Sequence, residues 1–586
     1  MAQDVGQARA AEAPQGGAPP AAAYSNATRY LCAASYLDDG FAETVVEQII
    51  RGEHHAVAPA HGIHLGPILR HALAARRRRL VRDGLVTAVL VMGFVAGVAV
   101  TSVWLVQAVA LVVSLWLLFG AFVRLVTGRF LAAFGFFVTA VVVIPVAASV
   151  LTLLAFKFQG YGVGLGDLQP EYGVPGLPSG GPPWLLVLVT LLAVWGICAG
   201  HRLAVHHTLA VELTPQMYDP AQAPPPGAGL ARRIAELEYA QEGNVSIYSP
   251  GGDVSPFIGF GKIQEEWNLV TPLRPATSFD VVPDDLAEAD EDADNAASPM
   301  TFVPIDIDEF HDRVRAGVES LAAPGMEMEE AISQLVVEDR VFVAGLLPRG
   351  SRYLEGDRPR QHVDADEVRR VARAERGRVR HYLCVRMLAW QSELEVTAFV
   401  HLSTRGGMLY VEFVATVQPG ISADYRRVDT YERLDLRNAM RALGGAVGDV
   451  FLSPLAVSRV VGTGWRALWD MVRTPDDVKQ IRRQLMFDYG CRHSVRERGA
   501  APQHAVRFQL YDALERIAVV QRRTLGVVVR TLREHGYDVS DISGQATTVI
   551  NNSRFTTNVS NSTLVNSPVA TGNRARALFK TIAGGE

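Results

Sequence analysis

The stretch AARRRRLVRDGLVTAVLVMGF, which runs from Ala74 to Phe94, decides the fold that this sequence predicts. Five arginines lie within seven positions of it, namely Arg76, Arg77, Arg78, Arg79 and Arg82. After Asp83 the next charged residue is Arg124, so a basic cluster is followed directly by a long uncharged run. This pattern is typical of the cytoplasmic side of a membrane entry, where basic residues also favour contact with anionic lipid. The stretch therefore predicts that the chain enters a membrane here, with the five arginines as topology and lipid-contact residues.

The uncharged runs that follow predict four transmembrane helices. The first run, Gly84 to Val123, holds 40 residues. As a single helix it would reach about 60 Å, twice the hydrocarbon thickness of about 30 Å, so we divide it into two spans joined by a tight turn. A buried hairpin of a soluble protein is the alternative, but an uncharged run of this length exceeds ordinary core helices. The predicted spans are about 85–103, 106–123, 130–156 and 183–200.

The distribution of basic residues predicts the orientation of these spans. Arginines lie before the first span, between the second and third, and after the fourth, whereas the loop between the third and fourth holds only Lys157. Because positively charged loops stay in the cytoplasm, both termini of this inner (plasma) membrane protein are predicted to be cytoplasmic. The predicted spans contain no Asp, Glu, Lys, Arg or His. Since ionisable residues mark most ion routes, we interpret the bundle as an anchor, with a channel formed by an oligomer as the alternative.

The second half of the chain predicts a cytoplasmic α+β domain with an antiparallel sheet. The segment from Arg378 to Gly420 predicts three consecutive strands, of which the last two are joined by a hairpin at Thr404–Gly407. Apolar periodicity predicts helices after these strands, including a long one from Gln503 to His535, so helices are expected to cover the sheet. The predicted organisation is a disordered tail (1–23), a cytoplasmic helical segment (24–83), the transmembrane region (84–204), a Pro-rich linker with a Gly-rich β-segment and an acidic linker (205–295), the α+β domain (296–543) and an Asn/Ser/Thr repeat tail (544–586).

The Gly-rich β-segment holds the one candidate ligand loop. Four glycines that could approach a phosphate occur there: Gly251, Gly252, Gly259 and Gly261. However, the segment contains neither GxGxxG nor GxxxxGK[ST], the motifs that cradle phosphates in nucleotide-binding proteins. A turn-rich β-segment is therefore the preferred interpretation, with a ligand loop as the alternative.

The sequence assigns no catalytic residue, no cofactor and no metal ligand. It contains no GxSxG, HExxH or CxxC motif, and its four cysteines stand singly, as in proteins of a reducing compartment. Cys491 and His493 are neighbours in sequence, but such close neighbours seldom meet as nucleophile and base. The formal net charge of −5 is small for 586 residues, so no nucleic-acid partner is expected.

The C-terminal tail carries a short repeat. Asn-Ser followed after one residue by an apolar residue recurs three times between Asn552 and Val569. This pattern predicts a short β-solenoid-like segment that completes a stack with another chain, because three copies are the lower limit for a stable stack. A disordered polar tail is the alternative. The candidate assembly residues, about five positions apart, are Ile550, Phe555, Val559, Leu564 and Val569.

The order of these features resembles a group of known membrane proteins. The run AVAPAHGIHLGPILRHALAARRRRLVRDG, then the four spans, then GNVSIYSPGGDVSPFIGFG, resembles uncharacterised multi-pass integral membrane proteins of high-GC actinobacteria over roughly residues 28–420. The resemblance implies no activity, substrate or site residue. We therefore expect a membrane-tethered interaction, scaffold or sensor protein that contacts the bilayer and forms a homo-oligomer or binds a protein partner. The alternatives are a channel or transporter component and a membrane-bound enzyme with an unrecognised cytoplasmic site.

Overall fold

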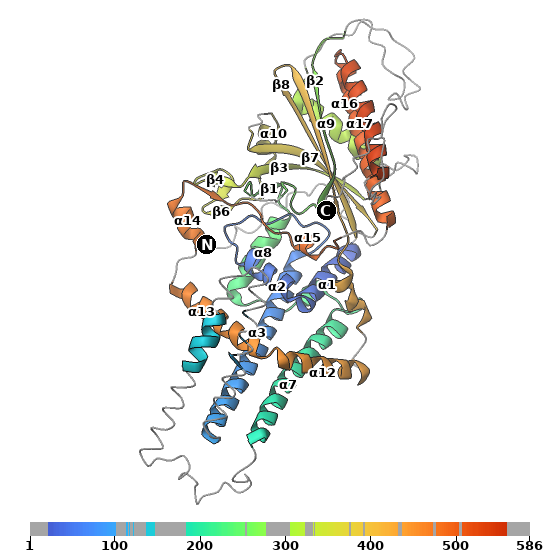
Figure 1. The fold of residues 1–586 in the computed structure, drawn as a ribbon. Helices are drawn as coiled ribbons and strands as arrows, with labels where there is room; N and C mark the ends of the chain where they lie inside the picture. The colour runs from blue at the N-terminus through green and yellow to red at the C-terminus, as the bar shows by residue number, and fades with distance from the viewer. Residues whose placement is uncertain are drawn as a thin grey trace, which may run out of the picture. The chain divides into compact units, whose positions relative to one another are not determined.

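The computed structural model describes a chain that divides into two compact units. Unit 1 comprises Met1–Leu73, Pro215–Thr430 and Asp476–Glu586, and unit 2 comprises Ala74–Thr214 and Tyr431–Pro475. Figure 1 shows the helices and strands of both units. The residues that the structure describes are 21–100, 113–114, 117, 121, 136–146, 183–251, 255–276, 305–322, 332, 334–373, 377–390, 393–431, 436–472, 476–502 and 507–559.

A six-stranded sheet forms the centre of unit 1. Its strand order is β1-β3-β7-β8-β9-β2, and all neighbouring pairs are antiparallel except β1 and β3, which are parallel. The first two strands of the chain therefore occupy the two opposite edges of the sheet. The strands are β1 (Val245–Tyr248), β2 (Lys262–Pro272), β3 (Leu335–Ala344), β7 (Val379–Ala389), β8 (Leu394–Arg405) and β9 (Met408–Gln418). Two smaller sheets pair β4 (Leu346–Pro348) with β10 (Met486–Asp488), and β5 (Leu354–Glu355) with β6 (Arg358–Pro359).

The hairpin between β8 and β9 has a tight two-residue turn. Arg405 pairs with Met408, which leaves Gly406 and Gly407 as the turn residues. Both glycines have positive φ, 60° and 73°, as the central positions of a type I′ turn require. The hairpin predicted from the sequence at this position is therefore confirmed, and it fixes the register of β8 against β9.

Helices cover one face of the sheet and build the main core. Helices α9 (Ile307–Glu319), α16 (Arg507–Glu534) and α17 (Ser540–Val559) pack on this face, as Figure 1 shows beside β2 and β8. Alternate residues of β8 point into the core, since a strand has a side-chain period of two. These are Leu394, Val396, Ala398, Val400 and Leu402, all buried. The expected mixture of helices and a largely antiparallel sheet is thus present in unit 1.

The opposite face of the sheet carries an aromatic cluster beside buried polar groups. Phe342, Tyr382 and Phe399 project from β3, β7 and β8, and Phe257 and Phe260 of the Gly-rich segment pack on them. Their ring centroids lie 4.5 to 6.5 Å apart. Shorter elements complete unit 1: α1 (Ala21–Leu37), α2 (Asp39–Thr44), η1 (Val45–Ile50), η4 (Pro220–Gln222), α8 (Ala228–Gln241), η6 (Ser320–Ala322), α10 (Ala365–Arg373), α11 (Ala423–Arg426), η7 (Arg427–Thr430), α14 (Asp476–Arg483) and α15 (Val495–Gly499).

Unit 2 is helical in its described part. Its helices are the portion of α3 (Leu65–Val100) that follows Leu73, η2 (Thr139–Val143), α7 (Pro183–His207) with its continuation η3 (Thr208–Glu212), α12 (Leu436–Phe451) and α13 (Pro454–Val472). A small apolar core joins α3, α7, α12 and α13, made of Val86, Val194, Cys198, Ala199, Ala446 and Ala456.

The predicted four-helix membrane bundle is wrong. Among the described residues, one helix, Leu185–Glu212, is long and apolar enough to cross a membrane, or two if the bent pair α12–α13 counts as one. Of the third predicted span the structure describes only residues 136–146, which are helical, and the rest of that span lies outside the described residues. The first predicted span continues a helix that begins at Leu65 and carries all five arginines. The second predicted span lies almost wholly outside the described residues. The length of the uncharged runs alone therefore overestimated the number of membrane-spanning helices.

The predicted β-solenoid-like tail is also wrong over its first part. Residues Ser540–Val559 form helix α17, which contains three of the five candidate assembly residues, Ile550, Phe555 and Val559. The helix forms because Ile542 and Ala546, four positions apart, are buried on the main core and Val549 packs beside them. Leu564 and Val569 lie outside the described residues.

Candidate functional site

The arginine cluster of α3 takes part in helix contacts of unit 2. Arg78 Nη1 donates a hydrogen bond to Thr208 Oγ1 at 2.6 Å. Arg82 Nε donates to Asp83 Oδ1 at 2.9 Å, and Arg459 of α13 lies 3.3 Å from Asp83 Oδ2. Asp83 is only 5% exposed, so its charge needs these two partners. Of the five arginines, Arg77 is exposed and the other four are half-buried. Lipid contact by these residues stays a prediction.

A cluster of polar contacts fixes α12 against α7 in unit 2. Arg202 of α7 donates two hydrogen bonds to the Asp449 carboxylate, at 2.6 and 3.0 Å. Trp195 Nε1 donates to the carbonyl oxygen of Leu443 at 3.2 Å. A bidentate arginine–carboxylate pair fixes orientation as well as position. The inner side of α12 is thus held against α7 by both charge and an indole hydrogen bond.

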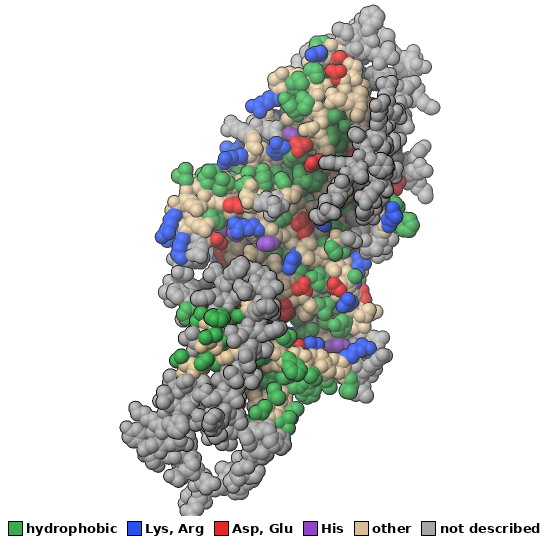
Figure 2. Space-filling model, viewed as in Figure 1, with side chains coloured by type: hydrophobic (Ala, Val, Ile, Leu, Met, Phe, Trp, Pro, Cys, Tyr) green, Lys and Arg blue, Asp and Glu red, His purple; other side chains and the backbone are tan. Residues whose placement is uncertain are grey.

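An apolar surface runs along the first half of α7. Six of its residues are between 43% and 55% exposed: Leu185, Val187, Leu188, Val189, Leu191 and Leu192. On α3, Leu85, Val91, Met92 and Val95 are exposed to a similar extent. Figure 2 shows apolar side chains gathered on the visible face of this unit. Contiguous apolar surface of this kind marks a binding or membrane-contact site in folded proteins.

The candidate ligand loop binds a carboxylate of its own chain. The backbone N–H groups of Gly259 and Gly261 donate to Glu497 Oε1 at 2.7 and 3.0 Å. Burial raises the pKa of Glu497, and the two N–H groups offset only part of that effect. Two of the four glycines thus come together around an acceptor, but the acceptor is internal. Gly251 is exposed, and Gly252 lies outside the described residues.

Replacing Gly261 by Ala is expected to lower the free energy of unfolding of unit 1 by at least about 2 kcal/mol. Gly261 has a φ of 91°, and a Cβ atom there would overlap the carbonyl oxygen of Val417. Gly251→Ala is the matched control, since a Cβ at Gly251 meets nothing within 4 Å. Hydrogen exchange of β9 peptides measures the effect. Equal protection in both variants would contradict the close approach described here.

A layer of charged side chains lies on the same face of the sheet as the aromatic cluster. Arg340 of β3 is 1% exposed and donates to Gly243 O at 2.7 Å, to Ser246 Oγ at 3.3 Å and to Glu338 Oε1 at 2.9 Å. Arg386 Nε of β7 lies 3.5 Å from the same Glu338 oxygen. Burial alone would raise the pKa of Glu338, but Arg340 and Arg386 hold it far below its usual value. Glu338 therefore stays ionised between two arginines.

Further along this layer, a second buried pair joins the sheet to α15. Arg496 Nε lies 3.8 Å from Glu395 Oε2, and neither side chain is exposed to solvent. Glu395 stands opposite Gln418 in the β8–β9 register. The nearby His61 ring is half-buried, with its Nε2 atom out of contact with solvent, and burial together with Arg386 lowers its pKa well below the usual value. These residues have the character of a structural charge layer that holds the 58–62 and 490–499 segments on the sheet.

On the helix-covered face, two histidine rings meet edge to face. His311 of α9 and His381 of β7 have ring centroids 4.9 Å apart. His381 Nε2 lies 2.9 Å from Asp339 Oδ1, and Arg315 lies 2.5 Å from the other oxygen of Asp339. Burial and the neighbouring His381 and His401 lower the pKa of His311 to about 3. At neutral pH His311 is therefore an uncharged ring packed in the α9 interface.

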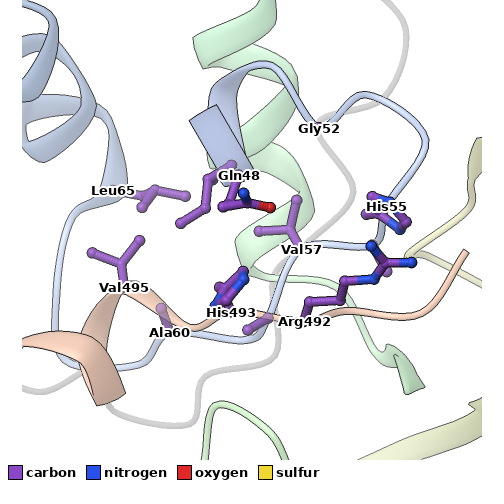
Figure 3. A pocket seen from close by; sticks show the side chains of 12 residues that line it. Gln48, Gly52, His55, Val57, Ala60, Leu65, Arg492, His493 and Val495 are labelled. Atoms are coloured by element: carbon purple, nitrogen blue, oxygen red, sulfur yellow. The ribbon is translucent and has the colours of Figure 1, made fainter. Parts of the chain in front are cut away.

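Unit 1 contains a small pocket. It lies between the 48–65 segment and the 492–495 segment of unit 1, with His55 and Arg492 at one end and Leu65 and Val495 at the other, as Figure 3 shows. Its volume of about 20 Å³ gives room for one or two water molecules. Burial and Arg492 lower the pKa of His55, so this ring is neutral. The pocket as it stands has no room for a substrate or cofactor.

The Cys491 and His493 pair does not form a nucleophile and base. The Cys491 thiol donates to the backbone carbonyl oxygen of His493 at 3.5 Å, and burial raises its pKa to about 12. A thiol that stays protonated is a poor nucleophile. No group of three His, Cys, Asp or Glu side chains suited to a metal ion occurs among the described residues.

Sequence reasoning missed the charge layer. Its one local signal is the run Glu338-Asp339-Arg340 inside the apolar strand β3, where three adjacent charges break the pattern of a buried strand. Glu338 and Arg340 have partners on β7 and near β1, whereas Asp339 points to the other face and contacts His381 and Arg315 of α9, so these positions follow from the tertiary fold alone.

Comparison with known proteins identifies one family. The family described as AbeC-like domain matches residues 266–566, just over half of the chain. The match begins inside β2, includes α12 and α13 of unit 2, and extends past Val559. No curated protein and no solved structure matches the chain.

Proposed function

We propose that this chain, which belongs to the AbeC-like domain family, is a membrane-tethered interaction protein, in which unit 2 attaches the chain to a bilayer and unit 1 binds a protein partner or a second copy. The family match covers the sheet and helices of unit 1 together with two helices of unit 2. The matched parts of unit 1 and unit 2 would then act together, with unit 2 holding the folded unit 1 at a membrane surface.

The exposed apolar side of α7 supports the proposed attachment to a membrane. The most apolar 18 residues of the helix Leu185–Glu212 have a mean hydropathy of 1.8, and 17% of this stretch is buried. Burial of apolar surface contributes about 25 cal/mol per Å², so six exposed apolar residues on one helix are unfavourable in water. A lipid bilayer removes that surface from water without a further protein layer.

The edge strand β2 supports the interaction half of the proposal. In the described sheet β2 pairs with β9 on one side and forms the end of the strand order on the other. It is 11 residues long, and Ile263 and Val270 are 39% and 38% exposed. A long edge strand offers backbone donors and acceptors to an added strand of a partner.

The membrane half is tested by flotation of the full chain with lipid vesicles. Wild-type protein is expected to float with the vesicles and to resist extraction at high pH. The variant Leu188→Arg/Leu191→Arg is expected to move to the soluble fraction, since each arginine costs about 2.5–3.5 kcal/mol at the centre of a membrane helix. The matched control is Ile263→Arg/Leu485→Arg, which places two arginines at exposed apolar positions of unit 1 and should leave flotation unchanged. Wild-type protein that stays soluble without detergent would refute the proposal.

A further inference from the structure

Helices α12 and α13 form a bent pair with a sharp corner. The two helices meet at 70°, with Leu452 and Ser453 between them. Pro454 begins α13, where a missing N–H group costs nothing because the first helical N–H has no partner within the helix. The corner is therefore encoded in the sequence. Figure 1 shows α12 crossing α7 rather than running along it.

Both helices expose an apolar stripe. On α12, Met440, Val447 and Phe451 are seven and four positions apart, so they share one side of the helix. On α13, Val461 and Trp465 are four positions apart. The exposed fractions are 62% for Met440, 50% for Val447, 74% for Phe451, 62% for Val461 and 60% for Trp465.

The inner side of the pair is already occupied. Ala446 and Ala456 are buried in the core of unit 2, and Leu443 and Val450 pack against it. The Arg202–Asp449 and Arg459–Asp83 contacts fix α12 and α13 to α7 and α3. The outer stripe therefore cannot be buried by rotating either helix, because rotation would expose the inner side and break these contacts.

The charge and the side-chain types of the pair favour a lipid surface as the occupant of the outer stripe. Residues 436–472 contain four arginines and two aspartates, and of these arginines Arg441 on α12 and Arg466 on α13 are exposed. Basic residues beside an apolar stripe, with a tryptophan among the exposed residues, are typical of helices that lie in the interface of an anionic membrane. The stripe also belongs to the same unit as the exposed apolar side of α7.

We infer that α12 and α13 lie flat in the boundary between the headgroups and the acyl chains of a bilayer that contains anionic phospholipid. Met440, Val447, Phe451, Val461 and Trp465 enter the acyl region, and Arg441 and Arg466 bind lipid phosphate groups. The inference rests on the proposed membrane attachment and adds to it a second lipid-binding element that does not cross the membrane. It also gives a role to the part of the AbeC-like match that lies in unit 2.

The test measures the depth of single labels in the full chain, reconstituted into vesicles of equal parts phosphatidylcholine and phosphatidylglycerol. The four native cysteines are buried, so a fluorophore can be attached at Phe451→Cys or Trp465→Cys, with Leu485→Cys in unit 1 as the control. Both pair labels are expected to be quenched more by a lipid nitroxide about 5–10 Å below the headgroups than by one at the bilayer centre. The control label is expected to be quenched by aqueous iodide alone.

Three other outcomes would overturn the inference. Stronger quenching of Phe451→Cys at the bilayer centre would make the pair a span. Quenching by iodide alone in vesicle-bound protein would leave the stripe in water. Loss of both quenching signals, with cross-linking between two Phe451→Cys chains, would assign the stripe to a second copy. In each of these cases the protein still floats, so the membrane attachment stands, whereas failure to float refutes the attachment itself.

Discussion

Replacing Glu338 by Gln is expected to lower the free energy of opening of strands β3 and β7 by about 3–5 kcal/mol. The substitution removes the negative charge between Arg340 and Arg386, and Arg340 is 1% exposed. A buried guanidinium without its carboxylate keeps its desolvation cost and loses the compensating attraction. Glutamine can still accept one hydrogen bond, but it restores no charge.

Hydrogen exchange of β3 and β7 peptides in the full chain measures this loss locally, without unfolding unit 2. Glu266→Gln on the exposed side of β2 is the matched control and is expected to change protection by less than about 0.5 kcal/mol. The double variant Glu338→Gln/Arg340→Gln is expected to be less destabilised than the sum of the single variants, because both charges of one pair are then absent. Additive losses would show that Glu338 and Arg340 do not interact through their charges.

Local turn chemistry made part of the sheet predictable, and sequence separation hid the rest. The Gly406-Gly407 turn identifies the β8–β9 hairpin because positive φ at two adjacent positions is encoded by those two residues alone. The partners of β1 and β2 are encoded differently. β1 pairs with β3 almost a hundred residues away, and β2 pairs with β9 about 150 residues away. Nothing local in Val245–Tyr248 or Lys262–Pro272 selects these partners.

The candidate sites show the same division between local and tertiary information. The glycines at 259 and 261 are unusual in the sequence, and both have the positive φ that explains them. Their ligand, Glu497, follows more than 230 residues later on α15, so the sequence could indicate an anion-binding loop but not that the anion is internal. Likewise, the five-residue spacing of apolar residues in the tail favoured a β repeat. Ile542 and Ala546 are four positions apart, which is a helical spacing, and their packing on the main core favours the helix.

The count of membrane spans failed for a different physical reason. A long uncharged run meets the composition requirement of a membrane helix, but it says nothing of where a helix begins. Helix α3 begins at Leu65 and carries its arginines into contacts with Thr208 and Asp83, so its charged half belongs to the folded unit. The amphipathic pair α12–α13 was hidden for the opposite reason, since its exposed apolar residues are spaced by helical turns and its uncharged runs are much shorter than a membrane span.

Acid is expected to destabilise unit 1 through His311. The ring has an ordinary pKa of 6.5 in the unfolded chain and a pKa of about 3 in the folded one. Between these values the unfolded state binds a proton that the folded state does not, so the free energy of unfolding falls as the pH falls. The expected loss from this ring is about 2 kcal/mol at pH 5 and on the order of 4 kcal/mol near pH 3.

The variant His311→Phe is expected to remove this part of the pH dependence. Phenylalanine keeps an aromatic ring against His381 and cannot be protonated, and neither His311 nitrogen has a hydrogen-bond partner among the described residues. Val314→Ala on the same helix is the control: it removes two buried methyl groups and should lower stability at every pH with an unchanged slope.

Protection of α9 and β7 peptides, compared between variant and parent at each pH from 7 to 4, measures the two slopes. A parallel loss in the parent and in His311→Phe would assign the acid sensitivity to other buried groups. His61 is the first of these, because its burial on the opposite face of the sheet shifts its pKa in the same direction. If protection depends less on pH in His311→Phe than in the parent and in Val314→Ala, the α9 interface is the part of unit 1 that opens first in acid. The reason is that protonation of His311 places a charge between α9 and the sheet.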